Sequence, residues 1–357
     1  MIEPVPLHLA AIVRAWQCQK RGLCCRIHRV QVDVVEQRRI TRALTEAGDP
    51  HVGQIARLAE IQGLPVLPMR DDAEHGPTCV FLDAERLCTL RTRFGESVYP
   101  QICKLFPFLS LLTPDRQLVS LSLQCPTALE LFLRETHFER LIEPDGIPPV
   151  DRVAPLASDD IPYYDAHGER LTCRAFWAKH WTWFDRFASA PEADPFERVA
   201  NFTRAVTGDE LPARATLSGP ALKNGVFDSA VMREVELLAG VAPRGLWHLW
   251  GHPPAQPHDL PDVACIDEQA ILTRYLIHRF FVSPDYMIAP DLGIRLVALW
   301  ATLLRWRIER ARHPSPVMAL RNLDRFFVHS GALGAVFDRT THAWRAVASL
   351  ARAVIIG

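Results

Sequence analysis

The sequence lacks any apolar run long enough to cross a membrane. Its longest strongly apolar stretch lies between Arg295 and Arg305, whereas a membrane-spanning helix needs about 20 such residues. The first 16 residues contain no basic segment, and Arg14 interrupts their apolar stretch, unlike a secretory signal peptide. We therefore expect a cytoplasmic protein with no membrane partner.

The sequence also lacks an excess of charge of either sign. Its 40 Lys and Arg residues nearly balance its 41 Asp and Glu residues, which gives a formal net charge of -1. Because broad binding of nucleic acid relies on an excess of basic side chains, we do not expect a nucleic-acid partner. Nothing in the chain resembles a G-x-G-x-x-G loop after a strand, so a Rossmann-type cofactor site is not supported.

Cysteine, in contrast, is concentrated in one part of the chain. Thiolates are soft ligands that suit zinc or an iron–sulfur cluster. The alternatives are disulfides and unrelated buried cysteines, but a cytosolic chain keeps its thiols reduced and an odd total of nine leaves one thiol over. We read Cys173 and Cys265 as ordinary apolar residues. The sequence therefore predicts metal ligation by the other seven: Cys18, Cys24, Cys25, Cys79, Cys88, Cys103 and Cys125.

The overall pattern predicts a mainly α protein with a small α+β cysteine-rich metal-binding N-terminal domain. A chain of 357 residues can bury one large core or two modest ones. We expect a cysteine-cluster domain at 1–140, a linker rich in proline and aspartate at 141–164, and a helical domain without a sheet of its own at 165–357.

Two helices and a hairpin are expected in the first hundred residues. Asp33–Ala47 has an N-cap signal, with Asp33 followed three residues later by Glu36, and His51–Gln62 reads as a second helix. Two short strands, Thr78–Asp83 and Arg86–Leu90, surround a tight turn. Such a hairpin would bring Cys79 and Cys88 together.

The last two cysteines of the group are expected on short helices. Pro100–Phe106 reads as one or two helical turns that carry Cys103, and Gln117–Gln124 alternates like a half-buried strand. Pro126 favours the first position of a helix at Thr127–Arg134, which makes Cys125 its N-cap. Backbone N–H groups there would stabilise a thiolate.

The C-terminal half is expected to be helical. The segment from Phe176 to Phe187 is rich in aromatic residues and reads as core. Residues 241–263, with three histidines, read as a loop. Apolar periodicity predicts four further helices, at Glu268–Val282, Pro290–Ala311, Val317–Val328 and Thr341–Ile355.

The cysteine spacing matches neither a zinc ribbon, which would show two C-x2-C pairs, nor the compact ferredoxin pattern. One four-thiolate site would leave three cysteines over. Two sites would need about eight ligands, so His28 or His75 would have to complete the second. Arginines near the cysteines, such as Arg91 and Arg93, would either offset the thiolate charge or lie on a solvated surface.

The segment Cys18-Gln-Lys-Arg21-Gly22-Leu-Cys24-Cys25 resembles the CxxCGxCC signature of the YkgJ-type cysteine-cluster proteins, described as zinc- or iron-chelating. Two later blocks are similar to the same superfamily: one from Cys79 through Cys88 to Pro107, and the final block Ser120-Leu-Ser-Leu-Gln-Cys125-Pro126. One position departs from the signature, because Arg21 stands where its second cysteine belongs.

The final block is most similar to the flagellin lysine-N-methylase (FliB) branch of that superfamily. The resemblance implies a four-iron (4Fe-4S) cluster and S-adenosylmethionine as cofactors, and methylation of lysine side chains on a protein or peptide. It implies no particular catalytic residue. Asp83, Glu85, Glu96 and Tyr99 are candidates for an acid or base, or are simply turn and surface residues.

Three functions remain open on the sequence. The first is an iron–sulfur enzyme that modifies a protein or peptide, similar to a lysine N-methylase. The second is an accessory protein in which zinc stabilises a small domain and the helical half binds a partner without catalysis. The third is a protein that passes on a metal or electrons. Metal analysis would discriminate between them.

Overall fold

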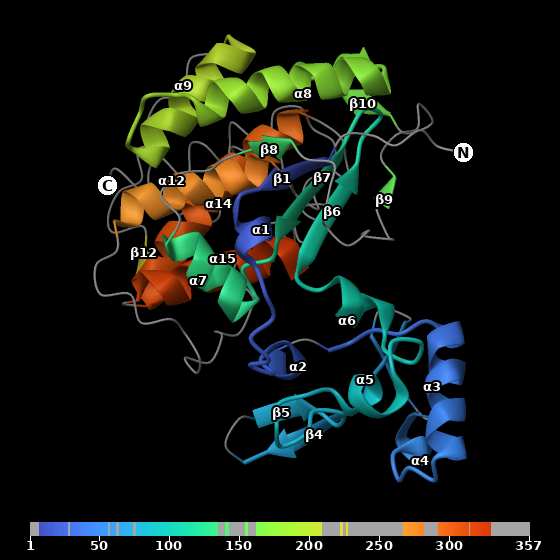
Figure 1. Ribbon diagram of the computed structural model, residues 1–357. Helices are drawn as coiled ribbons and strands as arrows, with labels where there is room; N and C mark the ends of the chain where they lie inside the picture. The colour runs from blue at the N-terminus through green and yellow to red at the C-terminus, as the bar shows by residue number, and fades with distance from the viewer. Residues whose placement is uncertain are drawn as a thin grey trace.

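The computed structural model describes the following residues: 7–27, 29–55, 58–61, 64–73, 76–134, 140–142, 154–155, 162–208, 222–223, 226–227, 267–281, 292–313 and 315–329. This part of the chain is mainly α with some β. Its buried apolar residues form two separate cores. We call the part around the larger core the large lobe, and residues 17–105, which surround the smaller core, the small lobe (Figure 1).

A five-stranded sheet, with strand order β8-β1-β7-β6-β9, lies in the large lobe. β1 pairs in parallel with β7, and β6 and β7 form an antiparallel hairpin. The alternation predicted for residues 117–124 is seen as β7, whose inner strand position leaves its last four residues buried. The strands are β1 (Leu7–Ala10), β6 (Phe108–Leu112), β7 (Gln117–Leu121), β8 (Arg140–Ile142) and β9 (Ala154–Pro155).

Helices cover this sheet and complete the large core. α8 and α9 lie together at one end of the molecule, and α12 and α14 lie between them and the rest of the lobe (Figure 1). The described helices of this lobe are α1 (Ile12–Ala15), α7 (Pro126–Arg134), α8 (Cys173–Ala188), α9 (Pro195–Thr207), α12 (Glu268–Phe281), α14 (Leu292–Arg312) and α15 (Pro316–His329).

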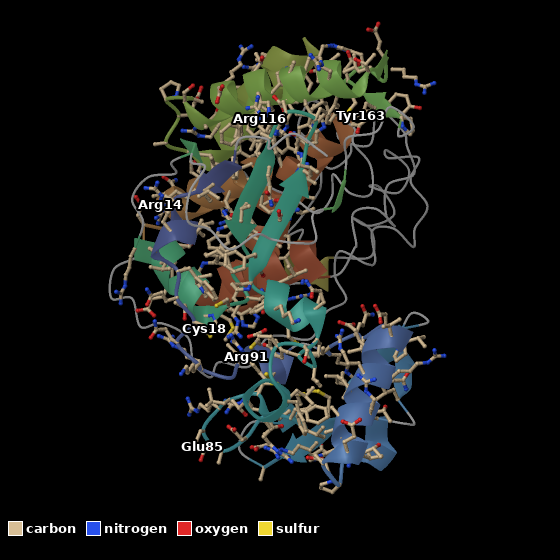
Figure 2. The ribbon with its side chains drawn as sticks, turned by 45° about the vertical axis from the view of Figure 1, so that its right-hand side comes forward. Arg14, Cys18, Glu85, Arg91, Arg116 and Tyr163 are labelled. Atoms are coloured by element: carbon tan, nitrogen blue, oxygen red, sulfur yellow. The ribbon has the colours of Figure 1, made fainter. Side chains whose placement is uncertain are left out.

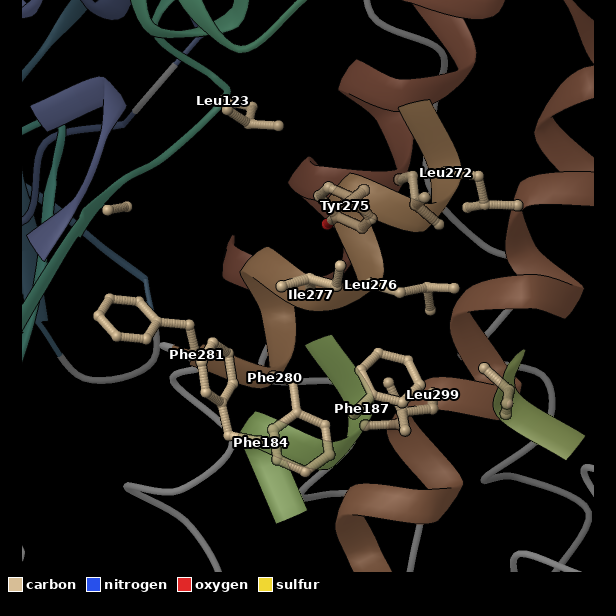
Figure 3. Close-up of a cluster of buried hydrophobic side chains, with 14 of the residues drawn as sticks. Leu123, Phe184, Phe187, Leu272, Tyr275, Leu276, Ile277, Phe280, Phe281 and Leu299 are labelled. Atoms are coloured by element: carbon tan, nitrogen blue, oxygen red, sulfur yellow. The ribbon is translucent and has the colours of Figure 1, made fainter. Parts of the chain in front are cut away.

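Aromatic side chains join these helices. Phe280 of α12 is fully buried. Its ring stacks on His180 and on Phe187, both of α8, with centroid separations of 5.4 Å in each case. Figure 3 shows Phe280 and Phe281 close to the aromatic side chains of α8. The aromatic segment predicted as core is therefore core, because its residues recur at helical spacing on the face that meets α12.

The small lobe consists of short elements around its own core (Figure 1). Two two-stranded ladders, β2–β3 and β4–β5, accompany five helices among its described residues. Their bounds are α2 (Cys24–Ile27), α3 (Val34–Glu46), α4 (Val52–Ile55), β2 (Ala59–Ile61), β3 (Leu64–Val66), β4 (Met69–Asp72), β5 (Gly76–Cys79), α5 (Thr89–Phe94) and α6 (Gln101–Leu105).

The longest helix of the small lobe, α3, begins where the sequence predicts. The carboxylate of Asp33 accepts a hydrogen bond from the backbone N–H of Glu36 at 2.7 Å, and the carboxylate of Glu36 accepts one from the backbone N–H of Asp33 at 3.0 Å. This capping box satisfies two N–H groups that would otherwise lack partners in the first turn.

Two local predictions in the small lobe are wrong. The helix expected at His51–Gln62 ends at Ile55, and residues 59–61 form β2 instead. The second strand of the expected hairpin is absent from the described residues, because α5 begins at Thr89 and only a single bridge joins Leu82 to Cys88. β5 pairs instead with the preceding strand, β4.

The two hydrophobic cores do not correspond to the two expected domains. The larger core includes Leu9 and Leu118 as well as Phe280, so residues from both sides of the expected linker at 141–164 share one core. The division into domains at 1–140 and 165–357 stays a prediction. The expectation of no sheet beyond 165 is wrong, since Leu222–Lys223 (β12) and Val226–Phe227 (β13) form a two-residue ladder, and Tyr163–Tyr164 (β10) pairs with Arg170–Leu171 (β11).

Several predictions fall outside the described residues: most of the linker, the histidine-containing loop at 241–263, the helix at 341–355, and His28, His75 and Cys265. Within the described ranges, no helix combines the length and apolar character that a membrane crossing requires.

Candidate metal centre

Two neighbouring cysteines of the small lobe, Cys24 and Cys25, lie at the start of α2. The Sγ atoms of Cys24 and Cys25 are 4.0 Å apart. Gly22, just before them, has φ of +68°, and a Cβ there would lie 3.2 Å from Leu82 and from Arg86. A glycine is therefore needed here, both for its positive φ and for the close approach of this turn to residues 82–86.

Cys79 and Cys88 flank the same turn. Cys79 ends β5, and Cys88 occupies the N-cap position of α5. Asp83 holds the turn between them, because its backbone N–H donates to the Leu87 carbonyl at 3.0 Å and its carboxylate accepts from the Leu87 N–H at 2.8 Å. The expected proximity of Cys79 and Cys88 thus arises from a closed turn.

Cys103 lies on α6, the short helix that the sequence predicts. The phenol of Tyr99 donates a hydrogen bond to the Cys103 carbonyl at 3.3 Å. Glu36 of α3 accepts a second hydrogen bond, from the backbone N–H of Gln101, at 2.7 Å. α6 is therefore fixed against α3, and this contact sets the position of Cys103.

The charges of these thiols affect one another's pKa values. The hydrogen bond between Cys24 and Cys25 lowers the pKa of Cys24. The same bond raises the pKa of Cys25, with burial and the charges of Cys24, Cys79 and Cys88 adding to the effect. Burial raises the pKa of Cys79 to about 11, with Cys88 and Cys24 contributing.

Burial likewise raises the pKa of Cys88, and the Cys24 charge adds to it. Burial also raises the pKa of Cys103 well above its ordinary value, followed by the charges of Cys88, Cys24 and Cys79. Each of the five thiols thus lies close enough to others to repel their negative charge. A cation among them would remove this repulsion and favour the thiolates.

The remaining two predicted ligands have different surroundings from these five. Cys18 is exposed, and Figure 2 shows it where the chain enters the small lobe. Cys125 is buried at the start of α7, where the indole N–H of Trp16 donates to its Sγ at 3.4 Å. Burial raises the pKa of Cys125 against the opposing N–H groups of Ala128, Trp16 and Thr127, and the Cys24 charge adds to the rise. The N-terminal position predicted for Cys125 is therefore confirmed, and Cys24 is its electrostatic link to the other thiols.

Arg21, which replaces a cysteine of the signature, has a different partner. Its guanidinium donates to the carboxylate of Glu130 on α7 at 2.9 Å. This side chain therefore joins the start of the small lobe to the large lobe.

Two of the arginines expected to offset the thiolate charge are paired with carboxylates. Arg91 pairs with Glu96 at 2.7 Å, and Arg93 pairs with Asp49 at 2.5 Å. Sequence reasoning missed Arg70 of β4. Its positive charge opposes part of the rise in the pKa of Cys79. Its guanidinium also donates to the Leu82 carbonyl at 2.9 Å. Pairing of β4 with β5 brings it there, and no local sequence signal marks it.

The candidate acids and bases lie mostly at the surface. Glu85 and Glu96 are exposed, and Asp83 serves the turn described above. Tyr99 differs, because burial and the charges of Cys103, Cys88, Cys24 and Cys25 raise its pKa.

Cys173, which the sequence analysis reads as an ordinary apolar residue, is buried, and its thiol donates a hydrogen bond to the Tyr163 hydroxyl at 3.2 Å.

The five thiols suit a soft metal in kind, but they are not arranged around a single ion. Among the described residues, no three Cys, His, Asp or Glu side chains have positions that could hold one metal ion. Burial and mutual repulsion disfavour the thiolate form of these side chains, and a bound cation would offset this cost as the thiols lose their protons. Binding would require side-chain rotation.

No protein-family model matches the chain, and searches of curated proteins and of solved structures found no match either.

Proposed function

We propose that the small lobe is a metal-binding module in which thiolates from Cys24, Cys25, Cys79, Cys88 and Cys103 hold an iron–sulfur cluster or zinc. The observation that carries the proposal is the convergence of these five buried or half-buried thiols, from four separate segments, where the charges of Cys24, Cys79 and Cys88 raise the pKa of neighbouring thiols. Thiols gathered in this way are costly to ionise without a cation, and a bound metal removes that cost.

The chain's own residues would contribute in defined ways. The turn held by Asp83 presents Cys88, and the contact of Glu36 with α6 presents Cys103. Arg70 adds a positive charge beside Cys79. A four-iron cluster, which the resemblance to the flagellin lysine-N-methylase branch favours, would supply redox or Lewis-acid chemistry, whereas zinc would supply folding free energy.

Cys18 and Cys125 stay predicted ligands of the same or a second site. Cys125 is the better placed, because it is buried and interacts electrostatically with Cys24. A centre that used Cys125 would bind both lobes at once, since Cys125 belongs to the larger core.

The proposed activity is modification of a protein or peptide, similar to lysine N-methylation with S-adenosylmethionine. This part of the proposal is supported by the resemblance of about residues 18–135 alone. The alternatives are a zinc-stabilised accessory protein that binds a partner, and a protein that handles metal or electrons.

The test is metal analysis of the full chain after anaerobic purification, together with its absorption spectrum. We expect bound iron with absorption near 400 nm, or a colourless protein with bound zinc. The double variant Cys79→Ser with Cys88→Ser should lose the metal, whereas Cys173→Ser, a buried cysteine of the large lobe, should keep it. If the wild type holds neither metal, or if the double variant keeps its full content, the proposal is wrong.

A second measurement separates the activities. An iron-containing sample that transfers labelled methyl groups from S-adenosylmethionine to a lysine-containing peptide would support the enzyme. A zinc-containing sample without transfer would support the accessory protein.

A further inference from the structure

One face of the sheet carries polar side chains where apolar ones would be expected. Ser120 of β7, and Ser122 and Gln124 just beyond it, alternate with leucines and are at most 1% exposed. Buried polar groups need hydrogen-bond partners. These three find theirs on α12 and α15, more than 150 residues away in the sequence.

Asp324 of α15 is the centre of these contacts and is fully buried. One carboxyl oxygen accepts a hydrogen bond from the phenol of Tyr275 at 3.3 Å, and the other accepts one from the Ser122 hydroxyl at 3.3 Å. The Gln124 side chain also bonds to it and donates to the Arg321 carbonyl at 2.7 Å. Asp324 therefore joins α12 and α15 to the segment after β7.

That segment is the turn that carries Cys125. The backbone N–H of Cys125 donates to the Ser122 carbonyl at 3.2 Å, and the N–H of Gln124 donates to the Ser122 hydroxyl at 3.3 Å. The Ser122 N–H donates in turn to the Pro107 carbonyl at 2.8 Å. Ser122 thus connects Asp324 to the backbone that places Cys125 at the start of α7.

The protonation state of this carboxyl changes in a physiological range. Burial raises the pKa of Asp324 to about 6, against the opposing charge of Arg279 and the hydrogen bonds from Gln124, Tyr275 and Ser122. Of the charged or titratable side chains that the structure describes, Arg279 and Tyr275 of α12 act on this carboxyl, and His278 of α12 stacks on Tyr275. Burial and the Arg279 charge lower the pKa of His278 to about 4, so His278 is neutral near pH 6, where the buried Asp324 titrates, and gains a proton only near pH 4.

We propose that Asp324 is a pH-dependent latch that holds the Cys125 turn, residues 122–125, against α12 and α15 and that weakens when its carboxyl ionises. The latch does not depend on a bound metal, and so goes beyond the function proposed above. When the turn opens, water reaches the carboxyl and its pKa returns to about 3.9. Since the pKa is higher in the closed state, opening becomes easier as the pH rises from about 4 to about 6, and levels off above that.

A difference of about two pKa units corresponds to an increase of about 100-fold in the opening equilibrium over this window. Hydrogen exchange with mass spectrometry on the full chain measures it, with wild type and Asp324→Asn compared between pH 4 and 7. Asparagine keeps the shape of the side chain without a titrating proton. The ratio of wild-type to variant exchange should rise up to about 100-fold in the peptide that contains residues 122–129, and stay flat in a reference peptide from α9.

A flat ratio in the peptide at 122–129 would overturn the latch, and so would an equal rise in the α9 peptide, which would mean global destabilisation. A second variant keeps the test valid if Asp324→Asn fails to fold. Tyr275→Phe removes one hydrogen-bond donor to the carboxylate, so the pKa of Asp324 should rise further and the upper end of the window should move above pH 6. An unchanged window would also overturn the proposal.

Discussion

Replacing Glu36 by alanine is expected to destabilise the small lobe far more than replacing another glutamate of the same helix. The Glu36 side chain is only 9% exposed. Its carboxylate accepts two backbone hydrogen bonds, one from Asp33 at the start of α3 and one from Gln101 at the start of α6. Alanine removes both acceptors, and the Gln101 N–H would then lack its partner.

The magnitude follows from these two bonds. Loss of a capping interaction costs about 1 kcal/mol, and loss of a charge-assisted hydrogen bond costs about 1.5–3 kcal/mol. We therefore expect Glu36→Ala to lower the free energy of unfolding by about 3 kcal/mol. The matched control is Glu46→Ala. Glu46 is 71% exposed and pairs with Arg42 only at 4.0 Å, and exposed pairs of this kind contribute about 0.5 kcal/mol or less.

Urea unfolding of the full chain, followed by a probe of the small lobe such as limited proteolysis, measures both variants. Glu36→Ala should also bind metal more weakly, because α6 carries Cys103. If the two variants differ by less than about 1 kcal/mol, the contact between α3 and α6 does not hold the lobe together, and the account of how Cys103 is positioned is wrong.

Two further outcomes are expected. Arg21→Cys restores the CxxCGxCC signature but should leave the metal content unchanged, because the Arg21 side chain pairs with Glu130 on α7; an added equivalent of metal would show that this position does face the centre. Phe280→Ala should lower the free energy of unfolding by about 3–5 kcal/mol, as for other buried phenylalanines. The control Val35→Ala, at a position 69% exposed, should change it by about 0.5 kcal/mol or less. Equal effects of the two variants in urea unfolding would contradict the aromatic core described above.

Local signals in the sequence predict local structure well. The capping box of Asp33 and Glu36, the short helix that carries Cys103 and the N-terminal position of Cys125 all depend on residues within a few positions of one another. Three of the four helices predicted from apolar periodicity at the end of the chain are also seen, as α12, α14 and α15, and the fourth lies outside the described residues.

The sequence-based predictions are wrong or incomplete where contacts between residues far apart in the sequence determine the structure. Residues 86–90 have a strand-like composition, but β5 pairs with β4, and Cys88 starts a helix instead. The same holds for the site. Convergence of Cys79 and Cys88 was predictable from their short separation, whereas the partner of Arg21 lies 109 residues away. Asp324 has no motif of its own, and only the packing of α15 on the segment after β7 reveals its contacts.

The small lobe is an insertion whose two ends meet. The chain leaves the large lobe at Trp16 and returns at Phe108, and the rings of these two residues contact each other with centroids 5.1 Å apart. Residues 17–105 therefore form a closed loop on a framework that is folded around its own core. A loop with fixed ends gains less entropy on unfolding than a free chain, which stabilises the folded lobe. Because its core is separate from the larger core, the lobe can still open locally while its ends stay in place. Loss and recovery of a ligand in the small lobe can then be a reversible local event, with refolding guided by the contact between Trp16 and Phe108.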